Sequence, residues 1–334
     1  MDSVELKRRQ SLSLDEKIKL SNMAIQNYYD FLDGHVYISV SGGKDSTVIY
    51  DMVRRLYPDV KAVFLDTGLE HPENREFVKT KMTNVEWVKP KKSFYQVLQD
   101  EGFPIPSKEQ AKFIKEYQTT KSAYLKRVRT EGKPRTFEKR YKKYLKQNPT
   151  TKREEYYQIF QVQYPQELLD VNKRCRISKC WQFLANSKYR CSDKCCDILK
   201  KNPAKSFGKK FGLFPITGEM AVDSTSRRRL YLKNGCNALS SGKIKSTPLG
   251  FWTEKDAWEY IKRFNLPFSD AYKHGLERTG CMFCLFGITQ DKKGQERFKI
   301  MQQYHPELYK YCMEKLGIKD LLDFVKANGI KIDY

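Results

Sequence analysis

The stretch Ser41–Ser46, SGGKDS, follows an apolar run, Val36–Val40, and precedes a second apolar pattern. A glycine pair lets a ligand approach the backbone closely, and the unpaired N–H groups at the start of a following helix favour an anion. Lys44 adds a positive charge, and the serines add hydroxyl donors. This combination predicts a loop that binds phosphate groups. The loop is not a Walker A motif, because that motif needs four residues between its first glycine and Gly-Lys-Ser/Thr.

Two groups of cysteines form a second set of residues with chemical potential. Cys195 and Cys196 are adjacent, in RCSDKCCDILKK, and Cys281 and Cys284 form a C-x-x-C pair that begins 85 residues after Cys196. Four thiolates can hold a zinc ion or an iron–sulfur cluster. Zinc sites usually pair two C-x₂₋₄-C segments, and adjacent cysteines fit that pattern poorly. The residues alone leave both metals open, beside unliganded buried thiols.

Positive charge is concentrated in one part of the chain. Residues 111–210 hold 27 lysines and arginines against 9 acidic residues, a net charge of +18 of the chain's +23. Such a one-signed segment with interleaved aromatics predicts a nucleic-acid-binding surface, with an acidic protein partner or plain solubility as alternatives. The basic residues chosen as candidates are Lys139, Arg140, Lys142 and Lys143. The aromatics are Phe113, Tyr117, Tyr124, Phe137, Tyr141, Tyr144, Tyr156 and Tyr157.

The elements that must position these residues alternate between strands and helices. Ser13 has the pattern of a helix N-cap, and Pro72 stands where a helix should begin. Asp66 and Thr67 follow the second strand, at the edge of the sheet where nucleotides bind in open α/β folds. We therefore expect an α/β protein with a Rossmann-like parallel sheet and helices on both faces. The expected strands are 36–40, 61–65, 84–88 and 213–217.

The loop SGGKDS resembles the signature of the PP-loop ATP pyrophosphatases, which grip the β,γ-pyrophosphate of ATP and cut between the α and β phosphates. The resemblance implies that ATP adenylylates an acceptor and that pyrophosphate leaves, with Mg²⁺ stabilising the departing charge. It implies catalytic roles for Lys44, Asp45 and Ser46. The implied ATP-binding residues are Ser41, Gly42, Gly43, Lys44, Asp45, Ser46, Asp66 and Thr67.

The region Thr247–Cys284 resembles the tail of the PAPS/APS reductase family, in its pattern of Pro-Leu, Trp, Asp-x-Trp, Leu-Pro, Tyr, Gly and C-x-x-C. The pairing of adjacent cysteines with C-x-x-C is similar to that of APS reductases and of the ATP pyrophosphatases of DNA phosphorothioation. Those proteins carry a [4Fe–4S] cluster, so the resemblance implies one here. Its ligands would be Cys195, Cys196, Cys281 and Cys284.

The segment Gly218–Arg229 resembles the arginine-rich substrate segment of the same family. The family has an arginine soon after the glycine, where this chain has Glu219 and Met220. The resemblance therefore points to Arg227 and Arg228 as the residues that contact a substrate phosphate.

Three functions compete. The first is an ATP pyrophosphatase with a [4Fe–4S] cluster that activates a nucleic acid, DNA slightly favoured over RNA, for sulfur incorporation supplied by a cysteine desulfurase or another donor. The second is a sulfonucleotide reductase. Against it stand the complete SGGKDS loop, which such reductases have in degenerate form, and the absence of a cysteine after Cys312. The third is a non-catalytic nucleic-acid-binding protein with a structural metal, in which the loop would be idle. We expect the first.

The chain is expected to be cytoplasmic, because no apolar run is long enough to span a membrane and its first residues lack the apolar core of a signal peptide. We expect a PP-loop domain formed by residues 1–106 and 211–290. A basic helical insertion, residues 107–210, interrupts it and ends in the first cysteine group. Residues 291–334 should form a helical extension.

Overall fold

The computed structural model describes residues 2–131, 137–163, 177–240, 244–290 and 296–334. Its centre is a six-stranded sheet with the order β3-β2-β1-β4-β6-β5. Every pairing is parallel except that of β5 with β6. The strands are β1 Val36–Val40, β2 Ala62–Leu65, β3 Val85–Val88, β4 Phe214–Thr217, β5 Asn237–Ala238 and β6 Lys245–Ser246.

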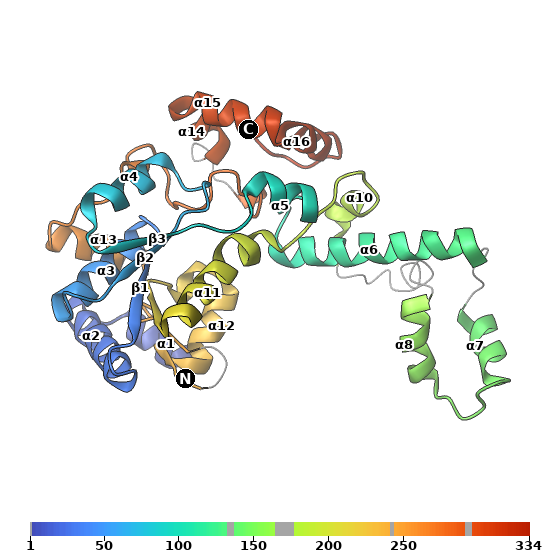
Figure 1. Ribbon diagram of the computed structural model, residues 1–334, viewed down its shortest axis with the longest axis horizontal. Helices are drawn as coiled ribbons and strands as arrows, with labels where there is room; N and C mark the ends of the chain where they lie inside the picture. Colours follow the sequence, from blue (N-terminus) through green and yellow to red (C-terminus); the bar gives the residue numbers. More distant parts are fainter. Residues whose placement is uncertain (1, 132–136, 164–176, 241–243, 291–295) are drawn as a thin grey trace.

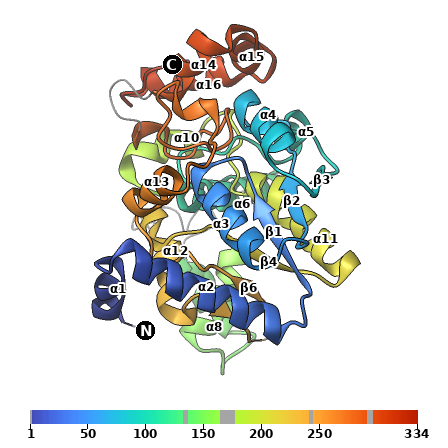
Figure 2. The ribbon, with the colours of Figure 1, turned by 90° about the vertical axis from the view of Figure 1, so that its left-hand side faces the viewer.

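Helices cover both faces of the sheet because its strands are apolar on both sides. On β1, Val36, Ile38 and Val40 belong to the large core, whereas Tyr37 points to the opposite face. Tyr37 meets Phe207 there, with the ring centroids 5.4 Å apart. The helices against the large core are α2 Leu14–Phe31, α3 Lys44–Leu56, α4 Pro72–Lys81 and α13 Glu254–Arg263, and the helix on the opposite face is α11 Asn202–Phe211. Figure 2 shows this layered arrangement from one end.

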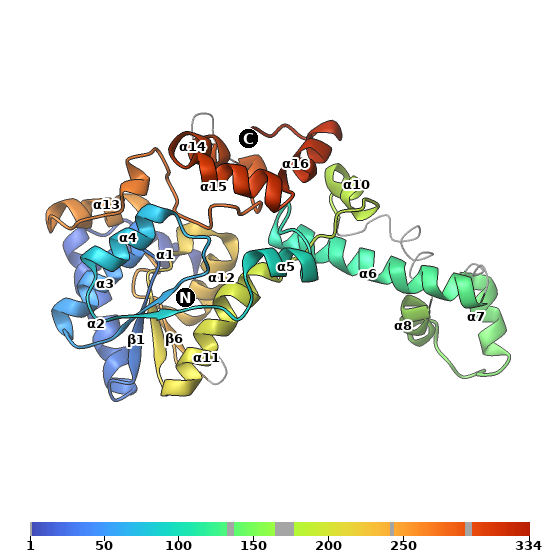
Figure 3. The ribbon, with the colours of Figure 1, turned by 45° about the horizontal axis from the view of Figure 1, so that its top comes forward.

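A second hydrophobic core lies beside the sheet. It includes Val97 and Leu98 from α5, Leu199 from the first cysteine segment, Phe283 from the second and Leu321 from the C-terminal helices. Both cysteine segments therefore share one core with the C-terminal extension, which packs above α5 in Figure 3. The helices of this region are α5 Phe94–Glu101, α10 Gln182–Ala185, α14 Arg297–Tyr304, α15 Pro306–Lys310 and α16 Ile318–Ala327, with π-helical turns at η2 Asp197–Lys201 and η6 Tyr311–Lys315.

The basic insertion forms an arm that projects away from the sheet (Figure 1). It consists of a long helix, α6 Lys108–Glu131, followed by α7 Phe137–Leu145 and α8 Arg153–Gln163. Tyr141, Tyr144, Tyr156 and Phe160 pack together between α7 and α8. These aromatics thus form a small core that holds the two helices together.

The predicted fold is confirmed. Each predicted strand appears, with its observed start at the predicted residue or one residue later. Ser13 caps α2 through a capping box with Glu16, and Pro72 begins α4. Asn148 and Pro149 lie in the connection between α7 and α8. Within the described residues, no helix has the length and apolar character needed to cross a membrane. The remaining helices are α1 Ser3–Gln10 and α12 Thr225–Asn234, with 3₁₀ turns at η1 Lys179–Trp181, η3 Ala221–Asp223, η4 Asp270–Tyr272 and η5 Ile288–Gln290.

Candidate active site

The loop after β1 lies where the order of the strands reverses, because β2 pairs with one side of β1 and β4 with the other. Ligands of open α/β sheets bind at such a point. Gly42 has φ +76°, and a Cβ atom there would lie 2.7 Å from the carbonyl oxygen of Asn74. The hydroxyl of Ser46 donates to the carbonyl of Gly43 over 2.8 Å and accepts the N–H of Ser41 over 3.1 Å. The loop is therefore held in one shape by its own residues and by α4.

A distant segment closes over the same loop. Tyr272, at the end of η4, accepts the N–H of Lys44 at its hydroxyl, over 2.7 Å. A Cβ on Gly43 would lie 2.7 Å from Oγ1 of Thr279, so a larger residue there would have to displace the Thr279 side chain. The N–H groups of the first turn of α3 have no intrahelical acceptor, and one of them is thus bound by a hydroxyl that a ligand oxygen could replace.

Lys44 and Asp45 form a charged pair at the start of α3. The ammonium of Lys44 lies 3.6 Å from Oδ1 of Asp45 and 3.1 Å from Oε1 of Glu254. Burial raises the pKa of Asp45 to about 6, although the Lys44 ammonium opposes that change. Burial opposes charge on Lys44 as well, but the nearby carboxylates outweigh it and raise the pKa of Lys44. Lys44 is thus a buried cation placed beside the loop.

Oδ1 of Asp45 is buried and has no hydrogen-bond partner within the described part of the chain. A buried carboxylate oxygen that accepts no hydrogen bond from the described residues, with the Lys44 ammonium 3.6 Å away, fits a hard cation such as Mg²⁺, which prefers oxygen ligands. The residues present are therefore compatible with a Mg²⁺ ion, with Asp45 as a protein ligand.

The end of β2 supplies the other expected nucleotide contacts. Asp66 is buried, accepts the N–H of Gly68 and pairs with Arg75 over 3.0 Å. The hydroxyl of Thr67 donates to Glu70 over 2.8 Å, and the N–H of Thr67 donates to the same carboxylate over 3.0 Å. Both predicted residues thus lie at the carboxyl edge of the sheet, one strand away from the loop, in a turn that their own side chains stabilise.

The segment that begins at Gly218 also reaches the loop. A Cβ on Gly218 would lie 2.4 Å from the carbonyl oxygen of Asp45. Five residues later Asp223 interacts electrostatically with Asp45, and Arg227 pairs with Asp223 over 2.5 Å. Arg228 is exposed. Arg227 therefore lies paired with Asp223 near the loop, while Arg228 stands on the surface of α12.

The four cysteines of the predicted metal site come together. Cys195 interacts electrostatically with Cys196, Cys281 and Cys284, and burial raises the pKa of Cys195 and of the C-x-x-C thiols. Among the described cysteines, no three sulfurs lie within 4.8 Å of one another. A zinc ion holds thiolates about 3.8 Å apart, because Zn–S bonds of about 2.3 Å point to the corners of a tetrahedron. The four thiols are thus spaced more widely than a single zinc ion requires.

Lys200 lies between this cysteine group and the turn after β2 that contains Asp66 and Thr67, at the carboxyl edge of the sheet. Its ammonium interacts electrostatically with the Cys281 thiol and lies 3.3 Å from Oε1 of Glu70, the carboxylate that holds Thr67. Although partial burial opposes the charge, these two neighbours raise the pKa of Lys200. Sequence reasoning missed Lys200, Glu70, Tyr272 and Glu254. The sequence offers one indication of Lys200: it stands four residues after Cys196, which is about one turn along a helix.

The candidate nucleic-acid contacts lie on α7. Lys139, Lys142 and Lys143 are exposed, and Arg140 is half-buried. The interpretation of the aromatics needs correction. Phe113 and Tyr117 pack against the second core, and Tyr141, Tyr144 and Tyr156 belong to the small core of the arm. Aromatic rings bury a large apolar area, so those on two short neighbouring helices pack against each other. The side chains of Tyr124, Phe137 and Tyr157 are outside the described ones.

Comparison with known proteins finds relatives that match different shares of the chain. An uncharacterized protein of Methanocaldococcus jannaschii is 21% identical over 309 residues, which cover 90% of this chain and 53% of that protein. An adenosine 5'-phosphosulfate reductase of Burkholderia cepacia is 32% identical over 94 residues, 28% of this chain and 36% of that protein. The chain thus spans about half the length of the first relative and little more than a third of the second.

Further matches cover most of the length of the matched proteins. An adenosine 5'-phosphosulfate reductase of Geobacillus kaustophilus is 23% identical over 257 residues, 77% of this chain and 75% of that protein. The crystal structure of the phosphoadenylyl-sulfate reductase of Candida auris aligns with 81% of this chain and 96% of that one, at 17% identity and a TM-score of 0.41. The family model for the phosphoadenosine phosphosulfate reductase domain matches residues 35–162 and 135–285, more than half of the chain. The chain therefore belongs to the phosphoadenosine phosphosulfate reductase domain family.

Proposed function

We propose that this protein is an ATP pyrophosphatase that carries a [4Fe–4S] cluster and adenylylates a nucleic-acid acceptor for sulfur incorporation, with DNA slightly favoured over RNA. The observation that carries the proposal is the complete SGGKDS loop with Lys44 and Asp45 at the head of α3, at the switch point of the sheet. Neither side chain is part of the hydrophobic packing, and each places charge beside the loop.

The loop is suited to a departing pyrophosphate. An acceptor oxygen would attack the α-phosphorus of ATP, the bond from that phosphorus to the bridging oxygen would break, and the electron pair would leave with pyrophosphate. Lys44 and the N–H groups of α3 would stabilise the negative charge that builds on the leaving group, and Asp45 would hold the Mg²⁺ that neutralises it. The outer sulfur of a persulfide, carried by a donor such as a cysteine desulfurase, would then attack the adenylylated acceptor and AMP would leave. A thiol would cleave the remaining S–S bond, so that the sulfur stays on the acceptor and the donor's cysteine leaves in a disulfide with that thiol.

The cysteine group supports the iron–sulfur part of the proposal. Cys195, Cys196, Cys281 and Cys284 lie together, partly buried against apolar residues of the second core. A cluster presents four separate iron atoms to its ligands, so its thiolates stand farther apart than those on one ion, in keeping with the spacing found here. A bound cluster would supply a redox-active centre, and Lys200 would connect its ligand Cys281 to the nucleotide edge.

A sulfonucleotide reductase is the second candidate. The names of the relatives from Burkholderia cepacia and Geobacillus kaustophilus favour it. Such an enzyme needs a reactive thiol for the sulfur of its substrate. Burial raises the pKa of Cys191 to about 12 and also raises that of Cys312, which makes both poor nucleophiles. Cys180 is the exposed cysteine of the described residues, and Cys175 lies outside them.

A product assay separates these functions. Anaerobically purified protein is incubated with ATP and Mg²⁺, with and without DNA or tRNA, and AMP and pyrophosphate are measured. Parallel samples receive APS or PAPS with a thiol reductant, and sulfite is measured. The proposal expects pyrophosphate from ATP, increased by nucleic acid, and no sulfite. Sulfite release without pyrophosphate would establish the reductase instead.

A further inference from the structure

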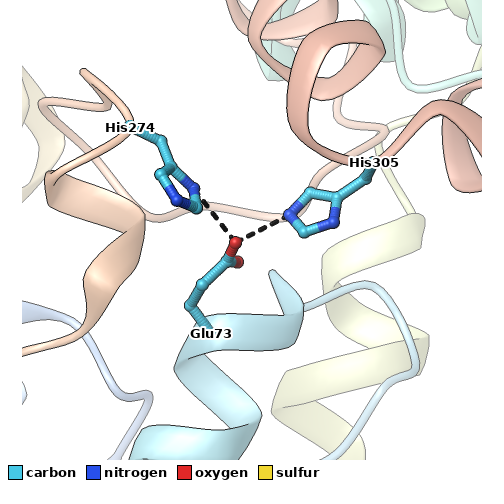
Figure 4. Close-up of side chains that lie close together, drawn as sticks. All are labelled: Glu73, His274 and His305. Atoms are coloured by element: carbon cyan, nitrogen blue, oxygen red, sulfur yellow. Dashed lines mark hydrogen bonds and ion pairs between the residues drawn. The ribbon is translucent and has the colours of Figure 1, made fainter.

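Three side chains from distant parts of the chain meet outside the candidate active site. Oε1 of Glu73 lies 3.0 Å from Nδ1 of His274 and 2.7 Å from Nε2 of His305. All three ligand-type atoms lie within 4.8 Å of one another, and Figure 4 shows both imidazoles pointing at the same carboxylate. The chain has only four histidines. The convergence of two of them on one buried glutamate is therefore not a surface coincidence.

Each of the three side chains is fixed by its own element. Glu73 is in the first turn of α4, His274 follows η4, and His305 joins α14 to α15. The ring of His274 stacks on Tyr304 with centroids 3.9 Å apart and planes 9° from parallel. The side chains are mostly buried, with exposed fractions of 13% for Glu73, 24% for His274 and 19% for His305. The site thus has fixed walls and one side that solvent can reach.

The hydrogen bonding of this group is incomplete. Both imidazoles address Oε1 of Glu73, whereas its Oε2 is buried and has no hydrogen-bond partner among the described residues. Burying a carboxylate oxygen without a hydrogen-bond partner costs folding free energy. A cation at the centre of the three side chains would be bound by this carboxylate. This is a second observation, independent of the convergence of the ligands.

We propose that Glu73, His274 and His305 form a binding site for a divalent transition ion of the zinc type. Two imidazoles and a carboxylate are the ligands that such ions take, and three protein ligands leave a fourth position for water. Tetrahedral bonds of about 2.0–2.1 Å place ligand atoms about 3.3 Å apart. The observed separations of 3.0 and 2.7 Å therefore need only a few tenths of an ångström of expansion.

The site would join the C-terminal helices to the pyrophosphate loop. Asn74, next to Glu73, contacts Gly42 of the loop, and Tyr272, two residues before His274, binds the N–H of Lys44. His305 belongs to the C-terminal extension. Metal binding should therefore fix the C-terminal helices against both elements that shape the loop, and it should protect them from proteolysis and thermal unfolding.

The test is a titration of the purified full-length protein, its cysteine cluster intact, with Zn²⁺ and separately with Co²⁺. The variants are Glu73→Gln, which keeps the shape of the side chain, and His305→Gln, which keeps a polar side chain without the imidazole. The control is His35→Gln at an exposed histidine outside the group. Cobalt distinguishes the ligands, because thiolate ligation adds an intense sulfur-to-metal band in the near ultraviolet that imidazole and carboxylate do not give.

We expect one Co²⁺ site with visible bands and no added thiolate band, and a rise in the unfolding temperature with Zn²⁺. Each variant should weaken metal affinity by about 100-fold or more, since loss of outer-shell partners alone costs 10- to 100-fold. Equal metal binding by the variants and the His35→Gln control would overturn the proposal, as would thiolate bands in every protein. If Zn²⁺ neither binds nor raises the unfolding temperature, the proposal is wrong and the group only holds the three segments together through the contacts of both imidazoles with Glu73. Thermal unfolding of each variant shows whether it is folded.

Discussion

The glycine-rich loop and the cysteine group are built in opposite ways. Six consecutive residues, Ser41–Ser46, form the loop, and a strand before it and a helix after it fix its shape. The cysteine group combines two segments 85 residues apart and depends on a core shared with the C-terminal helices. The residues of the first site are consecutive in the chain, whereas those of the second come together only through folding. Substitutions in the loop should therefore change chemistry with little effect on folding, whereas substitutions in the cysteine group should change metal content and local packing together.

The two sites are nonetheless connected. Lys200 contacts Cys281 and lies 3.3 Å from Glu70, whose carboxylate holds Thr67 at the nucleotide edge. A change in the cysteine group could therefore affect the turn after β2 through Lys200 and Glu70, and the reverse also holds. The predictions below ask how far the two sites act independently.

The largest expected effect is the loss of the cluster. Cys281→Ser should remove nearly all iron from anaerobically purified protein, from about four atoms per chain, because one of four thiolate ligands is lost. Iron analysis and visible absorption measure this. Cys180→Ser, at an exposed cysteine, is the matched control, and Cys312→Ala should also retain the metal. Stoichiometric zinc and no iron in the unmodified protein would contradict the iron–sulfur assignment.

Next in size is the loss of ATP cleavage. Lys44→Ala should lower the release of AMP and pyrophosphate by about 100-fold or more, because it removes a preorganised cation from the departing pyrophosphate. Lys79→Ala, at an exposed lysine of α4, should leave the rate unchanged. Lys44→Ala should also keep its full iron content if the two sites are separate. Formation of ADP and phosphate by the unmodified protein would rule out pyrophosphatase chemistry.

A smaller effect is expected from the arm. Neutralising Lys139, Arg140, Lys142 and Lys143 together should weaken nucleic-acid binding by about tenfold or more for all sequences alike. It should also flatten the slope of log affinity against log salt by up to about 3–4, since each lost phosphate contact removes about 0.9. ATP cleavage without an acceptor should be nearly unchanged. Filter binding over a range of salt concentrations measures both quantities.

The control for the arm removes the same charge elsewhere. It neutralises four exposed lysines of the C-terminal region, Lys315, Lys319, Lys326 and Lys331. If both variants lose affinity equally, binding reflects net charge alone and the arm has no specific role. If neither DNA nor RNA binds at low salt, the arm serves a protein partner or solubility.

The smallest effect should come from the contact between β4 and the loop. Gly218→Ala should destabilise the protein by about 1–3 kcal/mol, because a Cβ would lie 2.4 Å from the carbonyl of Asp45 and the backbone must shift. Gly280→Ala is the matched control, since a Cβ there meets nothing within 4 Å. Denaturant unfolding measures the difference. Gly218→Ala should lower ATP cleavage by less than Lys44→Ala does; equal stability of the two glycine variants would show that the contact is not tight.

Several features could be predicted because their causes are local. The strand Val36–Val40 has apolar residues in alternation and the loop after it has glycines and a lysine, so fold and phosphate site follow from consecutive residues. The capping box of Ser13 and the proline that begins α4 are local signals as well. The aromatics of the arm were misinterpreted because only their local spacing can be read from the sequence. Their spacing was visible, but whether Tyr141 and Tyr156 face solvent or each other depends on how two helices pack.

The sequence by itself determined the α/β class, the place of the glycine-rich loop between β1 and α3, the two cysteine groups and the concentration of charge, since each is a property of neighbouring residues. Only the tertiary structure decided which distant side chains complete them: Tyr272 on the loop, Glu254 beside Lys44, and Lys200 between Cys281 and Glu70. It also placed Glu73, His274 and His305 together. These meetings depend on strand order and on the docking of the C-terminal helices, and no short-range pattern encodes the distance between residues that far apart in the chain.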